Sequence, residues 1–390
     1  MSYPIVQLKS GRSIHTRNRH PWIFKGAIEH FPSFAEGDIL AVQDSDGRHL
    51  GHGYFTTTQS IAGRMLNFDH SDPLESVTRN LEQAITFRGS LFGTDTTAYR
   101  LVNGEADGLP GLIVDQYNTV LVVQHNTRGM DKLRDVLMRE LVRLVKPTAI
   151  FEHSTSATRT KEGLAPITQW IYETTTEPIF VQEHGLMFPV NVTTGQKTGL
   201  FLDQREMRVL VKEYATRRTV LNCFGYSGGF SIYALAGGAL RADTLDTDTN
   251  ALVVATETAT AQGYSKEQHE VIARDAFAFL SAPLPHPYDF IILDPPAFAK
   301  KSSDITNAAR GYRELNRLAM QHLPSNGLLL TASCSQYIDP ALFRTVIFNA
   351  AKDAKREVQI LSLHRMAADH PVSIYFPDGE YLKGLLLRVL

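Results

Sequence analysis

The pattern of hydrophobic and polar positions predicts two small domains before residue 183. Residues 1–70 contain short apolar runs separated by glycines, and "GDILAVQDSDGRHLGHGYF" places two such runs around the turn "DSDG". Strands joined by tight turns predict a small β-barrel-like module. Residues 71–182 open with apolar positions at helical spacing over 72–93. They continue with a strand, a Gly/Pro loop, the hairpin "LIVDQYNTVLVVQH" and the helix "MDKLRDVLMRELVRLV", which predicts an α+β middle domain.

From about residue 183 onward, strands and helices alternate. Seven runs are typical of strands: "TVLNCF", "RADTLD", "EVIARD", "FIILDPP", "LLLTASCS", "EVQILSLHRM" and "YLKGLLLRVL". Segments such as "TNALVVATETATAQ" and "ARGYRELNRLAMQHL" between them are typical of helices. Alternation of this kind predicts an α/β domain with a seven-stranded, mostly parallel sheet covered on both faces. The last two strands have a short connection, which predicts a hairpin at the sheet edge.

Composition indicates a soluble globular protein. The hydrophobic fraction is 43% and the charged fraction 21%, and no uninterrupted apolar stretch approaches the roughly 20 residues that cross a bilayer. The first twenty residues lack the apolar core and cleavage site of a secretory signal. Two cysteines in such a chain are expected to be reduced thiols, so we expect a cytoplasmic protein.

Charge is distributed unevenly although the net charge is only −2. Residues 1–30 carry five Lys or Arg residues against one acid, with histidines and aromatic residues among them. Cations that meet phosphates and rings that stack on bases are typical of a nucleic-acid surface. A solvated charged edge of a small β-domain explains the same pattern equally well.

In an open α/β sheet the ligand lies at the carboxyl ends of the strands. After the first strand, "NCFGYSGGFS" contains Gly225 and Gly228, which allow a sharp turn and a close approach of the backbone to a ligand. The second strand ends at Asp246, about twenty residues on, where a carboxylate is suited to accept hydrogen bonds from a ribose. Asp248 is the neighbouring candidate. An aspartate in this position is also typical of a helix N-cap.

The next two strands also end in acids. Asp275 is placed to read an adenine amino group or to cap the following helix. In "FIILDPPAFAKK" two prolines after Asp294 force a rigid, extended turn at the ligand edge. A glycine turn, a ribose acid, an adenine acid and Asp-Pro-Pro, in this order, favour an S-adenosylmethionine pocket over a dinucleotide-binding fold. No metal site is expected.

At these residues the chain resembles a known family, the class I S-adenosylmethionine-dependent methyltransferases of the bacterial 23S ribosomal RNA cytosine-C5 type, which carry an N-terminal PUA domain. The matching stretches cover essentially the whole chain in collinear order: "RHPWIFKGAI", "NGEADGLPGLIVDQY", "GQKTGLFLDQREMR", "VLNCFGYSGGFS", "LDPPAFAKK", "GYRELNRLAMQHL", "SCS" and "DHPVSIYFPDGEYLKG". The resemblance implies a PUA RNA-binding domain at 1–70, an α+β middle domain at 71–182 and a Rossmann-like catalytic domain at 183–390. It also implies S-adenosylmethionine as the cofactor, 23S ribosomal RNA as the partner and members that often pair as homodimers.

The resemblance also implies roles for single residues. A first group would hold the cofactor: Phe224, Gly225, Tyr226, Gly228, Asp246, Asp275 and Asp294. Phe201, Asp203 and Arg205 would lie at the methionine end of the cofactor or in the RNA cleft. A second group would contact RNA: Arg17, Arg19, His20, Trp22 and Lys300, although Lys300 and its neighbour Lys301 are equally explained as solvated. Phe224 and Tyr226 stand where many class I methyltransferases have glycines.

Cys334 lies between two serines at the end of the fifth predicted strand, beside the Asp-Pro-Pro strand end. Carbon 5 of cytosine is a poor nucleophile, and a thiolate that adds to carbon 6 makes it able to accept a methyl group. A buried core cysteine is the alternative interpretation, and it fits Cys223 better. We therefore predict that Cys334 is the nucleophile. Asp294 is predicted to hold the cytosine N3/N4 edge and to act as base, or else to pin the turn.

Three other functions are compatible with parts of this pattern. Asp-Pro-Pro followed by an aromatic residue, here Phe298, also occurs in enzymes that methylate purine nitrogens without a thiol. A second alternative is a small-molecule or protein methyl acceptor. A third is a non-catalytic RNA-binding ribosome-assembly factor, against which the intact set of acids and Cys334 argues.

Overall fold

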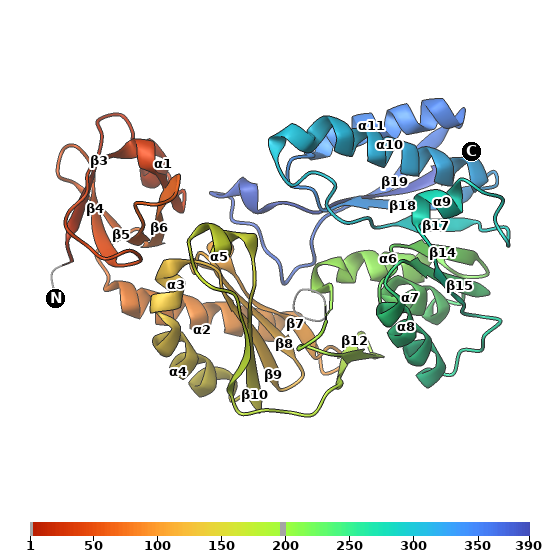
Figure 1. Cartoon of the computed structure of the whole chain (residues 1–390), viewed down its shortest axis with the longest axis horizontal. Helices are drawn as coiled ribbons and strands as arrows, with labels where there is room; N and C mark the ends of the chain where they lie inside the picture. Colours follow the sequence, from red (N-terminus) through yellow and green to blue (C-terminus); the bar gives the residue numbers. More distant parts are fainter. Residues whose placement is uncertain (1–2, 196–199) are drawn as a thin grey trace. The chain divides into compact units, whose positions relative to one another are not determined.

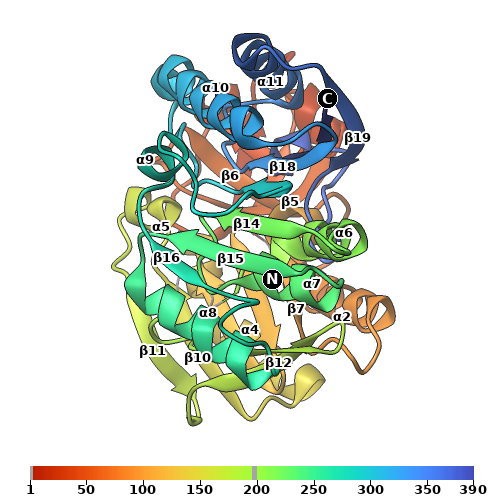
Figure 2. The ribbon, with the colours of Figure 1, turned by 90° about the vertical axis from the view of Figure 1, so that its right-hand side faces the viewer.

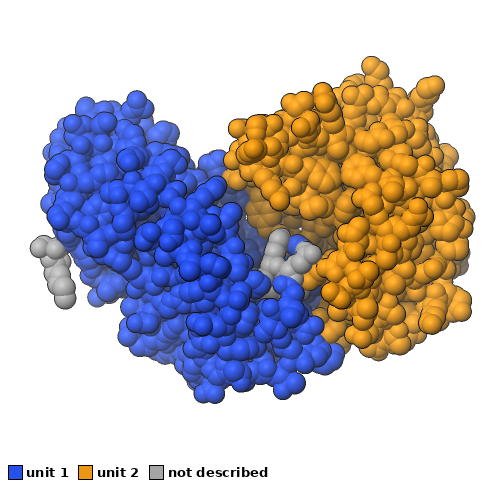
Figure 3. All heavy atoms as spheres, in the orientation of Figure 1, with its two compact units in different colours: residues 1–185, 190–202, 368–379 blue, residues 186–189, 203–367, 380–390 orange. Residues whose placement is uncertain are grey.

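The computed structural model describes residues 3–195 and 200–390, so residues 196–199 of the stretch "GQKTGLFLDQREMR" lie outside the described residues. The chain divides into two units, each with its own colour in Figure 3. The first contains residues up to Gly185 together with Val190–Leu202 and Ala368–Gly379. The second contains Leu186–Pro189, Asp203–Ala367 and Glu380–Leu390. Among the helices that the structure describes, none combines the length and the apolar character that a membrane-spanning segment needs.

The start of the first unit is a six-stranded sheet in the described part of the chain, with strand order β2-β6-β5-β4-β1-β3. Its elements are β1 (Ile5–Leu8), α1 (Ile14–Arg17), β2 (Trp22–Phe24), η1 (Lys25–Ala27), β3 (Ile28–His30), β4 (Ile39–Gln43), β5 (His49–Phe55) and β6 (Ile61–Asn67). The two runs around "DSDG" form the antiparallel pair β4 and β5, which confirms the predicted hairpin. Buried aliphatic residues from these strands and Phe55 form its core.

The rest of the first unit is built on a five-stranded sheet of order β11-β10-β9-β8-β7 among the described residues (Figure 1). Its elements are α2 (Pro73–Leu91), β7 (Ala98–Asn103), η2 (Gly104–Asp107), β8 (Leu112–Tyr117), β9 (Val120–His125), α3 (Arg128–Lys132), α4 (Arg134–Val145), β10 (Ala149–Ser154), α5 (Ala157–Lys161), β11 (Ile167–Tyr172) and β12 (Ile179–Glu183). The predicted strands and the helix over 72–93 are confirmed. The helix expected over "MDKLRDVLMRELVRLV" is divided into α3 and α4, because Leu133 leaves the helical conformation with a ψ of 0°.

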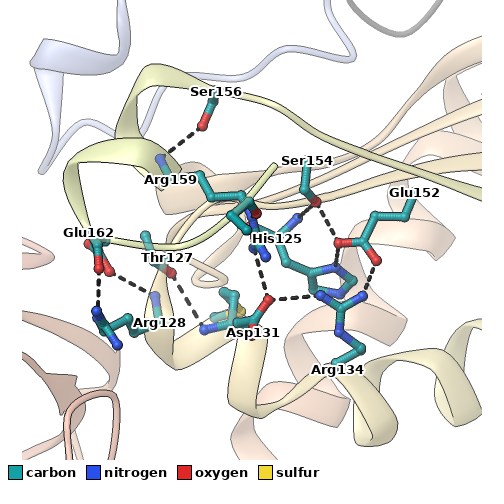
Figure 4. A network of polar contacts seen from close by, with 12 residues as sticks. His125, Thr127, Arg128, Asp131, Arg134, Glu152, Ser154, Ser156, Arg159 and Glu162 are labelled. Atoms are coloured by element: carbon teal, nitrogen blue, oxygen red, sulfur yellow. Dashed lines mark hydrogen bonds and ion pairs between the residues drawn. The ribbon is translucent and has the colours of Figure 1, made fainter. Parts of the chain in front are cut away.

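A largely buried polar network joins β9, β10, α3, α4 and α5 (Figure 4). Asp131 accepts hydrogen bonds from Arg134 at 2.7 Å and from Arg159 at 2.8 Å. Glu152, which is fully buried, accepts from Arg134 and lies 3.2 Å from the His125 ring nitrogen Nδ1. Burial by itself raises the pKa of Glu152, but the hydrogen bonds from His125, Ser154 and Arg134 outweigh it and lower the pKa to about 2.

This depressed pKa predicts acid-sensitive stability. Glu152 stabilises the fold above its ordinary pKa near 4.5, and that contribution, about 3 kcal/mol, is lost as the pH falls toward 2. Glu152→Gln is therefore expected to lower the free energy of unfolding at pH 7 by about 2–3 kcal/mol and to flatten the acid limb in urea titrations between pH 5 and 2. Glu82→Gln, which removes an exposed partner of Arg143, is the control and is expected to change stability by less than about 0.5 kcal/mol. An unchanged acid limb in Glu152→Gln contradicts the assignment.

The second unit contains the predicted seven-stranded sheet, with order β16-β15-β14-β17-β18-β20-β19 in the described part of the chain. Its elements are η3 (Leu202–Gln204), α6 (Arg205–Tyr214), β14 (Thr219–Cys223), α7 (Gly229–Ala236), β15 (Arg241–Asp246), α8 (Thr249–Ala261), β16 (Val271–Ala273), α9 (Ala276–Leu280), β17 (Phe290–Leu293), η4 (Ser302–Asp304), α10 (Ile305–His322), β18 (Gly327–Ser333), α11 (Pro340–Ala354), β19 (Val358–His364) and β20 (Lys383–Val389), preceded by β13 (Leu186–Val190). The strands from β16 to β18 pair in parallel, and β20 is antiparallel to both its neighbours. The strand order reverses at β14, between β15 and β17.

Helices cover this sheet as its buried strands require. The strand β17 has every residue buried, and so does β18, because helices pack on both sides of the central strands. On one face α10 and α11 lie side by side (Figure 2) and share a core with Cys223 and Leu293. On the other face α7 contacts β14 and β15. The expected hairpin of β19 and β20 is present, but its connection is not short. It runs over residues 365–382, of which 368–379 form part of the first unit and contain η5 (Pro377–Gly379).

Candidate active site

The turn after β14 is forced into an unusual backbone path. Phe224, Tyr226 and Gly228 all have positive φ, at 58°, 48° and 81°. A side chain on Gly225 has no room, because a Cβ there would lie 2.6 Å from a methyl of Thr244. Left-handed conformations cost non-glycine residues about 1 kcal/mol each, and such strain is concentrated at ligand sites. Phe224 and Tyr226 thus adopt backbone conformations that glycine takes more readily.

Asp246, at the end of β15, ties this turn to the neighbouring strand. One carboxylate oxygen accepts a hydrogen bond from the Tyr226 N–H at 2.8 Å, and the other accepts from Thr247 at 2.7 Å and from Asp248 at 2.9 Å. Asp248 instead caps α8, with its side chain accepting from Asn250 and Ala251. Between the two candidates, it is the Asp246 carboxylate that lies at the turn.

Asp275 lies at the end of the next strand and is exposed. Its carboxylate accepts from the Ala278 N–H at 2.9 Å and so caps α9. Ala276, the first residue of α9, is buried in the core beside it, and Phe277 is half-buried. The N-cap role foreseen for Asp275 is therefore present, and its contact with adenine stays a prediction.

Asp294 and Cys334 follow the adjacent parallel strands β17 and β18, in which Leu293 is paired with Thr331. The Cys334 sulfur lies 3.8 Å from the carbonyl oxygen of Pro295, and the side chain is only partly buried. Asp294 is half-buried and accepts a hydrogen bond from the Gln204 amide at 2.8 Å. Sequentially distant residues, the predicted nucleophile and the Asp-Pro-Pro turn, therefore meet at one edge of the sheet.

The two cysteines occupy different environments. Cys223 is fully buried, and burial raises the pKa of its thiol far above the ordinary value. Cys334 is partly exposed, and Ser335 next to it is fixed on the inside of the turn. The Ser335 hydroxyl accepts from the Ala299 N–H at 3.2 Å and shares a 3.0 Å hydrogen bond with the Tyr312 hydroxyl. Of the two thiols, only that of Cys334 is accessible from outside the core.

Three residues at this edge were missed by the sequence reasoning. Gln204 binds Asp294, as described above. The Tyr381 hydroxyl donates to Asp203 at 2.5 Å, and the Lys383 ammonium donates to the Ser335 carbonyl at 2.5 Å and to the Tyr381 carbonyl at 3.0 Å. The available signal for Lys383 was a lysine at the start of an otherwise apolar strand run, in "EYLKGLLLRVL".

Arg205 and Phe201 flank the Asp203 turn in the sequence. Arg205 is fully buried at the start of α6, so its guanidinium is a fixed positive charge within the second unit. Phe201 belongs to the first unit and is half-buried. Their contacts with the cofactor or RNA remain predictions, as does that of Lys300, which is exposed.

The predicted RNA contacts of the first unit lie on α1, on the turn that follows it and at the start of β2. Arg17 is partly exposed and pairs with Asp44 at 2.5 Å. Arg19 is exposed, with its guanidinium 5.7 Å from the centre of the Phe68 ring. The Nδ1 atom of the His20 ring accepts a hydrogen bond from the backbone N–H of Trp22 at 3.1 Å.

Trp22 has a structural role in the first unit. Its indole N–H donates to Glu105 at 2.8 Å, and its ring packs edge-on against Phe376 with 4.6 Å between centres. It also lines a cavity of about 350 Å³ with Arg64 and Glu105 among the other lining residues. The predicted contact of Trp22 with RNA stays a prediction.

Comparison with known proteins agrees with this geometry. A family model described as S-adenosylmethionine-dependent methyltransferase matches residues 109–387, and one described as PUA-like domain matches residues 6–68. The chain belongs to the S-adenosylmethionine-dependent methyltransferases. The fold expected from the sequence, a class I methyltransferase fold with an N-terminal PUA-like domain, is thereby confirmed.

Relatives of this methyltransferase extend over its whole length. Proteins named ribosomal RNA large subunit methyltransferase I from Aeromonas salmonicida and Shewanella denitrificans are 39% and 38% identical to it. Both comparisons cover 98% of this chain, and 98% and 99% of the relatives. The solved structure of SMU.776, described as a methyltransferase complexed with SAH, superposes with a TM-score of 0.86 at 21% identity and covers 99% of this chain and 100% of its own. This last likeness shows the shared fold.

The residues of the second unit fit S-adenosylmethionine, the cofactor of the family. The tight packing at Gly225 and the left-handed turn around it lie directly before α7, the position of cofactor-binding turns in this class of fold. Asp246 presents a carboxylate at the end of β15, beside the switch point of the sheet, where ligands of open α/β sheets bind. These residues would hold the nucleoside part of the cofactor. Asp294 follows β17, the strand next to β14, and Asp203 precedes Gln204, which binds Asp294.

Proposed function

We propose that this methyltransferase modifies carbon 5 of a cytosine in 23S ribosomal RNA through a covalent adduct with Cys334. The single observation that carries the proposal is the partly exposed Cys334 sulfur, 3.8 Å from the carbonyl of the Asp-Pro-Pro turn, at the carboxyl ends of β17 and β18. The names of the relatives, which denote methyltransferases of the large ribosomal subunit RNA, support the substrate class.

The chemistry assigns a distinct task to each residue. The Cys334 thiolate adds to carbon 6 of the cytosine, and the displaced electron pair makes carbon 5 nucleophilic. S-adenosylmethionine, when bound, supplies an electrophilic methyl group on its sulfonium. A base then removes the proton from carbon 5, and the carbon 6–sulfur bond breaks to return the thiolate. Asp294 is the group proposed to hold the cytosine N3/N4 edge or to accept that proton, with Gln204 fixing its carboxylate.

The decisive test of the substrate is a map of 5-methylcytosine in ribosomal RNA from cells with and without this gene. One cytosine of 23S ribosomal RNA is expected to lose its methyl group in the deletion strain and to regain it when the wild-type gene is restored. A gene carrying Cys334→Ala is the matched control and is expected not to restore it. An identical 5-methylcytosine map in both strains contradicts the proposal.

We further infer that residues 1–70 bind structured RNA, that 71–182 form a middle domain and that 183–390 carry the chemistry. Arg19→Ala is expected to weaken RNA binding about three- to tenfold and to reduce the slope of log affinity against log salt by about one, because one phosphate contact is lost. Filter binding at several salt concentrations measures both values. Arg48→Ala, an equal charge change at another exposed position in the same module, is the control. Equal effects of the two substitutions would count against a specific RNA contact at Arg19.

A further inference from the structure

A buried lysine lies directly behind the Cys334 turn. Lys383 is the first residue of β20 and is paired in register with Ser333, the last residue of β18. Its side chain is only 8% exposed. Its ammonium reaches across the end of β18 to the carbonyl of Ser335, the residue that follows Cys334, at 2.5 Å. The turn that carries the sulfur is thereby held against β20 by a charged group.

This ammonium has an unusual environment for a buried charge. Two of its three N–H groups donate to the carbonyl oxygens of Ser335 and Tyr381. Among the described residues, no carboxylate oxygen lies within ion-pair distance of the Lys383 ammonium. Charged groups are rarely buried without a carboxylate partner, because desolvation of an ammonium is costly. The ionisable groups that act on Lys383 are Cys334, Asp339 and Glu380, and both acids are exposed.

Burial lowers the pKa of Lys383 to about 8, against the opposing effects of Cys334 and the two acids. The group therefore stays largely protonated at neutral pH. A thiol beside an ammonium loses its proton more readily, since the positive charge stabilises the thiolate. A negative charge on the Cys334 sulfur and a positive charge on Lys383 therefore stabilise each other.

We propose that Lys383 is a positioning residue that holds the Cys334 turn and provides the positive charge that keeps the sulfur as a thiolate. The inference deepens the proposed function, on which it rests. Before RNA binds, the thiol proton passes to solvent and the ammonium of Lys383 compensates the sulfur's negative charge. That charge moves into the cytosine ring when the sulfur–carbon bond forms, and it returns to the sulfur when the bond breaks. Lys383 stabilises equally the thiolate that attacks carbon 6 and the thiolate that leaves it, and Lys383 itself contacts no substrate atom.

The test is the pH dependence of Cys334 alkylation by iodoacetamide in the full chain without RNA or cofactor, followed by mass spectrometry of the Cys334 peptide. An unperturbed cysteine has a midpoint near pH 8.5, and the midpoint of Cys334 in the wild-type protein is expected to lie below this value. Lys383→Met is expected to raise the midpoint by about one pH unit, which lowers the alkylation rate at pH 7 about tenfold. Lys383→Arg retains the positive charge and is expected to restore most of the shift.

Two controls separate charge from structure. Lys352→Met removes an exposed lysine of α11 and is expected to leave the Cys334 midpoint unchanged. Thermal unfolding reports whether Lys383→Met still folds. If this variant does not fold, the alkylation midpoint of the wild-type protein alone tests the inference. A wild-type midpoint at or above 8.5, or a folded Lys383→Met protein with an unshifted midpoint, overturns the inference. Neither result depends on methylation, so a failure of the cytosine proposal would appear separately, as cytosine methylation that survives in Cys334→Ala.

Discussion

Cys334→Ala is expected to reduce RNA cytosine methylation by at least about a thousandfold while S-adenosylmethionine binding stays unchanged. Removing a covalent nucleophile costs several orders of magnitude, because carbon 5 of cytosine has no other route to nucleophilic character. The Cys334 sulfur contacts the Pro295 carbonyl, so its loss leaves the separate turn that is bound by Asp246 untouched. Methyl transfer to ribosomal RNA from the deletion strain, with titration calorimetry for the cofactor, measures both quantities.

Cys223→Ala is the matched control, because this cysteine lies inside β14 and is fully buried. It is expected to lose some stability and to keep methyl transfer per folded molecule. RNA with 5-fluorocytidine at the target position is expected to remain covalently attached to the wild-type protein but not to Cys334→Ala, since the fluorine blocks removal of a proton from carbon 5. Full methylation by Cys334→Ala would instead favour a thiol-free reaction, such as methylation of a purine nitrogen.

Asp246→Ala is expected to weaken S-adenosylmethionine binding by about a hundredfold or more. The substitution removes the proposed ribose acceptor and also frees three backbone N–H groups, including that of Tyr226 in the strained turn. Each charge-assisted hydrogen bond is worth about 1.5–3 kcal/mol, so loss of the ribose contacts alone accounts for a factor of this size. Titration calorimetry with S-adenosylmethionine and with its demethylated product measures the loss.

Asp248→Ala makes the same chemical change two residues away, where the carboxylate caps α8. It is expected to cost about 1 kcal/mol of stability and to change cofactor affinity less than threefold. If Asp248→Ala weakened binding as much as Asp246→Ala, the ribose contact would have to be reassigned. If neither did, the acid at the end of β15 would serve only to hold the turn.

The strands of the sheet and the residues that follow them were predictable because both depend on local sequence patterns. The seven predicted runs became β14 to β20, and the central strands β17 and β18 are mostly apolar because they are buried along their whole length. The parallel arrangement then brings strand ends to one edge, which is why Asp246, Asp294 and Cys334 were identified from their places after such runs. The choice between Asp246 and Asp248 was open in the sequence, and the hydrogen bonds of the folded turn distinguish them.

Other features depend on contacts between distant segments. Gln204 is 90 residues from Asp294, and Tyr381 is 178 residues from Asp203, yet both pairs are hydrogen-bonded. Trp22 is predicted to contact RNA, and in the fold its indole N–H also donates to Glu105, 83 residues away. A hydrophobic pattern reports whether a residue is buried and not which distant residue it meets, so these partners were not visible in it.

The sequence by itself determined the α/β class, the order of strands and helices, the glycine turn, the Asp-Pro-Pro turn and the position of Cys334 after β18. These follow from short-range rules, since periodicity selects helix or strand and glycine and proline restrict the backbone over a few residues. Only the tertiary structure decided that Lys383 lies behind that turn and that Asp246 holds the turn after β14. Such contacts arise when β20 inserts beside β18, and that pairing depends on the packing of the complete sheet.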